Sequence, residues 1–220
     1  MIRSRRMLRR WFLAAAGAAV VLFAGVLGGL ACRPSWYSPA AIDYARLKAD
    51  KADLANTLDR IGGALNSGAP ITIALNADQV NRWLTARDEI WPDVDPPALD
   101  VLRDPQIAFL DGGVIRAAAR VAYRGWPAVV SGDVGVRIDG ERIHLEIGRP
   151  RIGVVPIPLV RWRLQSALAR GMEQAGVPVD ASGGGLAIDN DWVWPNGKRR
   201  FSIQSLEVSN GSLRVTLQPR

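Results

Sequence analysis

Alternating apolar and polar residues, interrupted by glycine-containing dipeptides, constrain the fold of this chain more than any other feature. The clearest example is VGVRIDGERIHLEIG, residues 134–148. Two-residue hairpin loops favour Asp-Gly and Asn-Gly, so a loop at Asp139–Gly140 sets Val136 opposite Ile143. Because neighbouring side chains of a strand point to opposite faces, this register places the apolar residues together. The stretch therefore predicts an antiparallel hairpin with one apolar side.

Two earlier dipeptides extend the same pattern. A loop at Gly125–Trp126 pairs Val121 with Val130, and a loop at Gly112–Gly113 pairs Leu110 with Ile115. These registers gather the large apolar residues on one face, as expected for an antiparallel meander that is solvated on its other side. The polar face then carries Arg116, Arg120, Arg124, Asp133, Arg137, Arg142, His144 and Glu146.

The C-terminal region repeats the hairpin signal twice. A loop at Asn210–Gly211 sets Val208 opposite Leu213, and a loop at Asn196–Gly197 sets Trp192 opposite Phe201. Each loop carries a glycine at a position where positive φ is common. Further antiparallel strands are therefore predicted at this end.

Three helices are expected around these strands. Ser38–Pro39 resembles a helix start, and apolar residues continue at helical spacing to residue 65. This first helix is expected to lie as a stalk against the domain. A strand at 71–75 is followed by Asn76 as the cap of a second helix with Trp83 facing inward. A third helix places Val160, Leu164, Leu168 and Met172 on one stripe and ends near Gly176.

The N-terminal segment is typical of an export signal. Residues 1–10 hold five arginines and no acid, and residues 11–31 form a run of 21 without charge. A helix of that length spans about 30 Å, the thickness of a bilayer's hydrocarbon core. The arginines are expected to stay cytoplasmic and to send the rest of the chain outward.

Three fates of this segment are open. It is long for a cleaved signal, which favours an uncleaved transmembrane anchor. Alternatively, Gly29-Leu30-Ala31-Cys32 resembles a lipoprotein cleavage box in which Cys32 would be lipidated, or the segment is cut and the chain released. The predicted organisation is a cytoplasmic basic segment at 1–10, a transmembrane helix or signal anchor at 11–31, a linker and stalk helix at 32–69, and an extracytoplasmic α+β domain at 70–220.

The sequence argues against nucleic-acid binding and offers no catalytic pattern. Without the five leading arginines, 23 basic residues of the 28 face 21 acidic ones, so the exported part is nearly neutral. His144, the only histidine, alternates with Arg142 and Glu146 on the polar face without a nucleophile nearby. In the acidic stretch 88–104, a calcium loop that began at Asp93 would have Pro96 and Pro97 in its middle, and Asp104 would stand where the closing glutamate belongs. We therefore predict a non-catalytic protein without a cofactor or metal site.

Two surfaces are candidates for binding. Small residues on the apolar face, such as Ala117 and Ala119, would leave a slot beneath the third helix, whereas aromatic and basic residues are typical of a membrane interface. The candidate residues for the ligand groove are Ala117, Ala119, Val121, Val134, Leu145, Leu164 and Leu168. Those for a membrane interface are Trp36, Tyr37, Trp192, Trp194, Arg199 and Arg200.

The order of segments resembles a known group. An N-terminal anchor, a helix, the segment ITIALNADQVNRWL and a meander ending in RIGVVPIP are similar to the YpmS-like membrane-anchored extracytoplasmic proteins. More loosely, the plan is similar to bacterial lipid-binding domains in which a curved sheet cradles a helix. The resemblance covers residues 10–175 and transfers no functional residue.

The expected fold class is α+β, with an N-terminal transmembrane helix followed by a curved antiparallel meander packed against one or more helices. The expected function is that of a membrane-tethered, non-catalytic domain that binds a lipid or another apolar ligand. The alternative is a structural or assembly protein that contacts another protein of the cell envelope. The expected partners are thus membrane lipid or an envelope protein.

Overall fold

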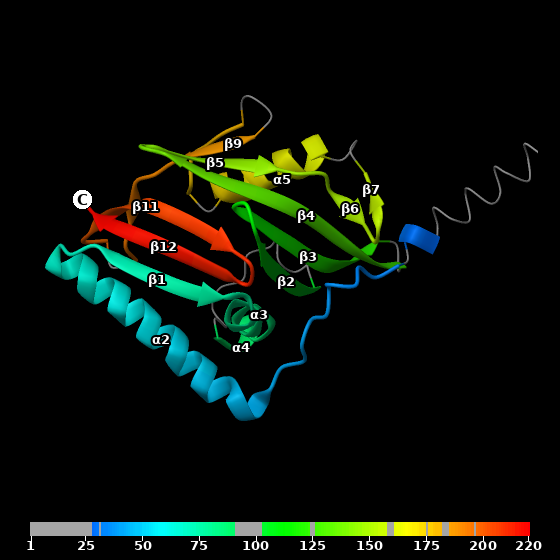
Figure 1. Cartoon of the computed structure of the whole chain (residues 1–220), viewed down its shortest axis with the longest axis horizontal. Helices are drawn as coiled ribbons and strands as arrows, with labels where there is room; N and C mark the ends of the chain where they lie inside the picture. Colours follow the sequence, from blue (N-terminus) through cyan, green and yellow to red (C-terminus); the bar gives the residue numbers. More distant parts are fainter. Residues whose placement is uncertain are drawn as a thin grey trace, which may run out of the picture.

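The computed structural model describes residues 28–30, 32–90, 103–123, 126–157, 161–174, 176–181, 185–195 and 197–220. It confirms an α+β fold in which every pair of neighbouring strands is antiparallel. Figure 1 shows the arrangement of the elements. The helices are α2 (Tyr44–Ser67), α3 (Ala77–Thr85), α4 (Arg87–Ile90) and α5 (Arg161–Gln174). The strands are β1 (Ile71–Asn76), β2 (Arg103–Leu110), β3 (Val114–Tyr123), β4 (Trp126–Asp139), β5 (Arg142–Ile147), β6 (Arg151–Ile152), β7 (Val155–Pro156), β8 (Val179–Asp180), β9 (Leu186–Asp189), β10 (Trp192–Val193), β11 (Arg200–Ser209) and β12 (Ser212–Pro219).

One sheet joins the two ends of the domain. Its four strands run in the order β1-β12-β11-β10, so the first strand pairs with the last. Helix α2 lies along this sheet (Figure 1) and buries Ile61 and Leu65 against Leu217 of β12. The expectation that this helix lies against the domain is confirmed. Its apolar stripe is narrow, so the sheet supplies most of the surrounding apolar surface.

The second sheet has eight strands, and its first half is the predicted meander. Strands β2, β3, β4 and β5 pair in chain order, and β9 and β8 continue the sheet beyond β5. The short β6–β7 hairpin branches from β4. Helix α5 covers one face, where Ala169 and Met172 pack around Ile147 and Leu186. A helix on the apolar face of the meander was predicted, although α5 lies over β5, β8 and β9.

The C-terminal registers are confirmed, and two meander registers are shifted without changing faces. Val208 pairs with Leu213 and Trp192 with Phe201, as predicted. Val136, however, pairs with Leu145 and not with Ile143. Gly140 has a φ of +55° and takes the first position of the loop, the place of glycine in a type II′ turn. Because a two-residue shift conserves side-chain direction, the predicted apolar and polar faces hold.

The third meander register, between β2 and β3, was predicted wrongly. Leu110 pairs with Val114, and Phe109 takes the place opposite Ile115. Three residues form the loop, with positive φ at both of its glycines, so the register slips by one residue. A one-residue slip reverses the faces of a strand. Phe109 is accordingly the residue that is buried, with 2% of its surface exposed.

One helix start was predicted correctly and another was predicted wrongly. Asn76 caps α3 and accepts a hydrogen bond from the Gln79 backbone N–H at 2.7 Å. The predicted start at Ser38–Pro39 is wrong, because α2 begins at Tyr44 behind an Asp43 cap. The Ser38 backbone N–H donates to a side chain of the larger sheet, and its segment runs extended.

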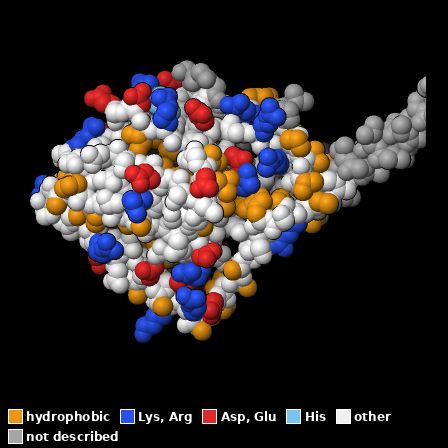
Figure 2. All heavy atoms as spheres, in the orientation of Figure 1, with side chains coloured by type: hydrophobic (Ala, Val, Ile, Leu, Met, Phe, Trp, Pro, Cys, Tyr) orange, Lys and Arg blue, Asp and Glu red, His pale blue; other side chains and the backbone are white. Residues whose placement is uncertain are grey.

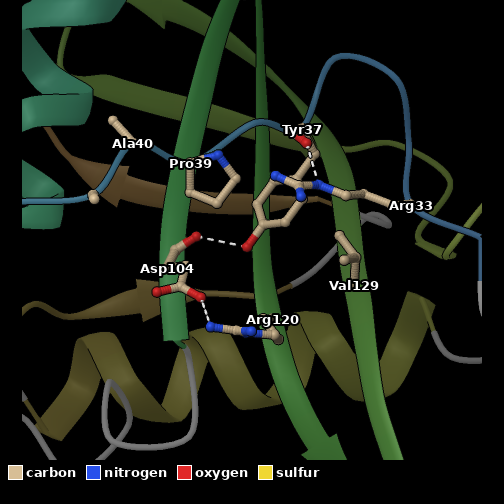
Figure 3. A pocket seen from close by; sticks show the side chains of 8 residues that line it. Arg33, Tyr37, Pro39, Ala40, Asp104, Arg120 and Val129 are labelled. Atoms are coloured by element: carbon tan, nitrogen blue, oxygen red, sulfur yellow. Dashed lines mark hydrogen bonds and ion pairs between the residues drawn. The ribbon is translucent and has the colours of Figure 1, made fainter.

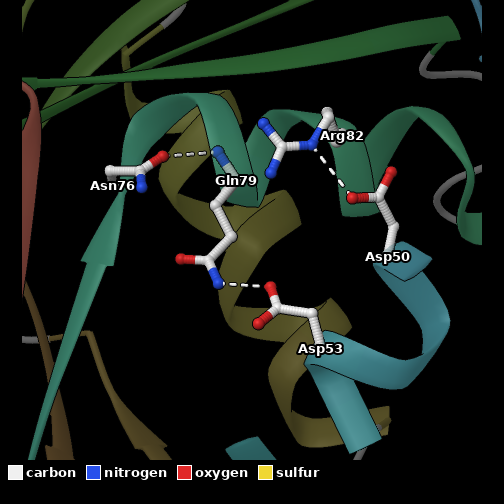
Figure 4. A network of polar contacts seen from close by, with 5 residues as sticks. All are labelled: Asp50, Asp53, Asn76, Gln79 and Arg82. Carbon is white, nitrogen blue, oxygen red and sulfur yellow. Dashed lines mark hydrogen bonds and ion pairs between the residues drawn. The ribbon is translucent and has the colours of Figure 1, made fainter. Parts of the chain in front are cut away.

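Helices α2 and α3 are joined by polar side chains (Figure 4). The Arg82 Nε donates to Asp50 at 3.0 Å, and the Gln79 amide donates to Asp53 at 2.6 Å. Asp50 is 7% exposed, whereas its partner Arg82 is half-buried, so the carboxylate is the better shielded of the two charges. These contacts fix α2 against the helix that follows β1.

The predicted membrane-spanning segment, 11–31, lies almost wholly outside the described residues. Of this segment the structure describes only residues 28–30, which are helical. In the part of the chain that the structure describes, no helix has the length and apolar character that crossing a bilayer requires. The transmembrane helix therefore stays a prediction.

Candidate functional site

A cavity of about 410 Å³ opens on the polar face of the larger sheet (Figure 3). It lies between strands β2, β3 and β4 and the extended chain that precedes α2. Arg120 and Val129 form its floor, since they are paired across β3 and β4 and point to the face opposite α5. The lining residues are Arg33, Tyr37, Pro39, Ala40, Ala41, Asp104, Arg120 and Val129.

A glutamine side chain holds the extended segment in place. Gln106 of β2 accepts from the Ser38 backbone N–H at 2.6 Å and donates to the Trp36 carbonyl at 3.3 Å. The amide thus bonds the segment as a neighbouring strand would. Between these two residues, Tyr37 is 3% exposed, and its hydroxyl donates to the Asp104 carbonyl at 2.8 Å. The cavity wall is therefore built from residues almost 70 positions apart.

An irregularity in β2 places Asp104 at the cavity. The pairing of β2 with β3 shifts between Arg103 and Gln106, and Asp104 has a φ of +49°. Proline cannot donate a ladder hydrogen bond, so Pro105 is compatible with a strand only at an edge or a bulge. The bulge turns the Asp104 carboxylate toward Arg120, with which it forms an ion pair (Figure 3).

Two arginines and one carboxylate leave an excess of positive charge at the cavity. Arg120 is paired with Asp104. The Arg33 Nε donates to the Tyr37 carbonyl at 2.6 Å, and its guanidinium lies 5.2 Å from the centre of the Tyr37 ring. Burial, followed by the nearby Asp104 carboxylate, raises the pKa of the Tyr37 hydroxyl above its usual range. Tyr37 is therefore a neutral donor at physiological pH.

A second ion pair supports the other side of the segment. Arg116 donates twice to the Asp133 carboxylate, at 2.6 and 3.1 Å, and lies 5.7 Å from the centre of the Trp36 ring. The hydrogen bond from Arg116 lowers the pKa of Asp133, and the same bond raises the pKa of Arg116. Both groups are therefore charged, and the guanidinium offers a fixed cation beneath the indole.

This arrangement can hold an anionic group next to apolar surface. Arg33 and Arg120 provide several N–H donors, and guanidinium groups match the geometry of phosphate and carboxylate. Pro39 and Val129 supply the apolar part of the wall. Around this cavity the chain presents donors and positive charge beside apolar surface, an arrangement compatible with an amphipathic ligand.

The predicted groove residues lie on the opposite face of the sheet. Ala119 is buried with 7% exposure, while Ala117 is exposed and Leu168 is 41% exposed. Leu145 packs into the cluster beneath α5. Val121 and Val134 are half-buried on that face, and the Leu164 side chain lies outside the described residues. Binding in this groove stays a prediction.

The predicted membrane-interface residues separate into two groups. Tyr37 lines the cavity and Trp36 precedes it. Trp192 and Arg200 belong to the four-stranded sheet, and Trp194 and Arg199 follow and precede its strands β10 and β11. Trp194 packs against Phe201 and lies beside Gly62 of α2. Arg199 donates to the Asn66 carbonyl, and Arg200 pairs with Asp191. The structure does not bring the two groups together.

Cys32 and the polar residues outside the cavity add no second site. Cys32 carries an exposed free thiol, and whether it is lipidated stays a prediction. Among the described residues, no group of three or more His, Cys, Asp or Glu side chains is placed to hold a metal ion. Most of the acidic stretch 88–104, including Asp93 and Asp95, lies outside those residues.

The sequence reading missed Arg33, Asp104 and Gln106 as functional residues. Asp104-Pro105 carried a usable signal, because a proline inside a predicted strand points to a bulge. The sequence gives no signal for the role of Gln106, because its hydrogen-bond partners lie 68 and 70 residues away.

No family model, curated protein or solved structure matches the chain. The resemblance to the YpmS-like group therefore stays a prediction.

Proposed function

We propose that this protein is a membrane-tethered, non-catalytic extracytoplasmic domain that binds the anionic headgroup region of a membrane lipid. The N-terminus would lie in the cytoplasm and residues 70–220 outside. Residues 11–31 would hold the chain to the membrane as an uncleaved helix, or Cys32 would do so as a lipidated residue. Lipid is also the ligand class expected from the sequence.

One observation carries the proposal. The wall of the cavity begins at Arg33, two residues after the uncharged run that ends at Ala31. A residue so close to the end of a membrane-spanning or lipidated segment lies at the level of the headgroups. Arg33 and Arg120 then face phosphate, and the apolar wall can accept the first part of an acyl chain.

The full chain in detergent, melted with and without added lipid, tests this function. A ligand that binds only the folded state raises the melting temperature. We expect phosphatidylglycerol to raise it for the wild type and for Arg46→Gln, an exposed position of α2. Arg33→Gln should lose that rise while retaining its fold.

The same melts separate this site from the alternatives. Ala119→Leu fills the predicted groove on the other face, so loss of the lipid effect in that variant alone would move the site there. A wild type that is indifferent to anionic and zwitterionic lipids alike would overturn lipid binding and leave the structural or assembly role.

A further inference from the structure

The stretch between Glu146 and Glu173 is unlike the rest of the exported chain. It contains five arginines, at positions 149, 151, 161, 163 and 170, and no acidic residue. Removing these five from the 23 basic residues after the apolar run leaves 18 against 21 acidic ones. The positive charge of the exported part is therefore concentrated in one segment.

The structure places part of this segment where the chain emerges from its apolar run. The stretch forms the β6–β7 hairpin and helix α5. At the hairpin tip, the Val154 backbone N–H donates to the Gly29 carbonyl at 3.1 Å. Gly153, with a φ of +60°, lies so close that a Cβ atom would collide with the carbonyl oxygens of residues 29, 30 and 32.

Exposed apolar side chains accompany these arginines. Val154 is 52% exposed at the tip, and Trp162, in the first turn of α5, is 61% exposed. Helix α5 begins five residues after β7 ends, so the two positions are near each other in the chain. Figure 2 shows hydrophobic side chains gathered where residues 28–30 meet the body of the molecule. Removing the exposed apolar surface of valine and tryptophan from water is favourable.

We propose that the β6–β7 tip and the first turn of α5 rest on the bilayer surface, with Val154 and Trp162 among the headgroups. Arg149 and Arg161, both exposed, face anionic lipid. Basic residues near a membrane surface are attracted to anionic lipid, and tryptophan favours the interfacial region. The proposal depends on the membrane tether of the proposed function, and it adds the orientation of the domain.

The bilayer is the occupant because of where the apolar run ends. The tip is bonded to Gly29, which belongs to the uncharged run 11–31. A membrane that holds this run is therefore in reach of Val154 without any linker. The end of the molecule that carries the C-terminus lies away from residues 28–30 (Figure 1).

Two valines of equal exposure provide a matched test. Val154 is 52% exposed at the proposed surface, and Val193 of β10 is 53% exposed in the four-stranded sheet. The full chain, with Cys32 retained, is reconstituted into phosphatidylglycerol–phosphatidylcholine vesicles with an environment-sensitive fluorescent amino acid at one position or the other. Flotation of the vesicles reports the tether, and a quencher attached to the acyl chains reports contact.

We expect a blue-shifted emission and strong quenching at position 154, and neither at position 193. Quenching at 154 should weaken at high salt, because salt screens the arginines. A chain that floats but shows equal quenching at both positions overturns the proposed surface while the tether stands. A chain that does not float overturns the tether and, with it, this orientation.

Discussion

Side-chain amides form hydrogen bonds with the backbone at several places in the described part of the chain. Asn81 accepts from the Ile107 N–H at 2.7 Å and donates to its carbonyl at 2.9 Å, which covers the edge of β2. Gln106 holds the extended segment, and Asn190 bonds Ile203 and Gly140. The cap at Asn76 was predictable because its partner is three residues away. The hydrogen bonds of Asn190 could not be predicted from local sequence, because their partners are 13 and 50 residues away.

Replacing Asn190 should be costly. Asn190 is 1% exposed, and Asn190→Ala leaves the Ile203 N–H and two carbonyls without this partner. Because an unsatisfied buried polar group costs about 1–3 kcal/mol, we expect a loss of about 3 kcal/mol in the free energy of unfolding. Asn66→Ala, at an exposed position of α2, should change it by less than about 0.5 kcal/mol. Urea denaturation measures both, and equal effects would contradict the proposed importance of the amide.

The Arg116–Asp133 pair should make stability depend on pH at the acid end. The pKa of Asp133 is lowered in the folded state from an ordinary value of 3.8, so the pair stabilises the fold above that pH. This contribution disappears as the pH falls through the folded-state pKa. We expect Asp133→Asn to lower the free energy of unfolding at pH 7. The difference in this free energy between variant and wild type should become smaller toward pH 2. Asp139 forms an exposed ion pair with Arg137 at 3.9 Å, so Asp139→Asn should change the free energy of unfolding less than Asp133→Asn does at neutral pH. If the destabilisation by Asp133→Asn does not change with pH, the ion pair is not the cause of the pH dependence of stability.

At the scale of elements, the sequence predicted faces better than registers. The periodicity of β3, β4 and β5 identified the side that α5 covers, because a shift of two residues leaves side-chain direction unchanged. It failed at β2, where the three-residue loop Asp111–Gly113 reversed the faces and buried Phe109. The three-residue loop places both of its glycines at positive φ. The same sequence is also compatible with a two-residue loop, so sequence alone does not decide the loop length.

Helix α2 offers two adjacent glycines with opposite expectations. Gly63 is exposed, and a Cβ there has no neighbour within 4 Å, so Gly63→Ala should stabilise the helix by up to about 1 kcal/mol. At Gly62 a Cβ would lie 3.3 Å from Trp194 Nε1. Gly62→Leu should therefore cost about 1–3 kcal/mol through overpacking. Thermal melts measure the change in melting temperature for each variant, which should be positive for Gly63→Ala and negative for Gly62→Leu. A stabilising effect of Gly62→Leu would mean that α2 is loosely packed on the sheet.

At the scale of the whole molecule, the two sheets are connected by hydrogen bonds that backbone N–H groups donate. The Gly211 N–H donates to the Phe109 carbonyl at 2.9 Å, and the Asn210 N–H donates to the Asp111 carboxylate at 3.0 Å. Antiparallel strands and covering helices were predicted from local patterns, but this junction was not, because it joins turns about 100 residues apart. The cavity escaped prediction for the same reason: its wall and its floor come from distant segments.

The junction predicts cooperative unfolding. Because β11 contacts β4 and β2, and Asn190 bridges both sheets, neither sheet should persist without the other. We expect hydrogen exchange of β4 and of β11 to be limited by the same free energy of opening. Mass spectrometry of peptides from each strand measures this, and distinct free energies for the two would divide the molecule into separate folding units.

The pairing of β1 with β12 also dictates an order of events in time. Thr72 and Thr216, hydrogen-bonded at 3.0 Å, are 144 residues apart. A ribosome releases the chain from its N-terminus, so β1 emerges long before its partner strand of eight residues. Such non-local pairing slows folding, and an unpaired edge strand is prone to join a wrong neighbour. The edge of β1 therefore stays open during synthesis until the residues of β12 have left the ribosome.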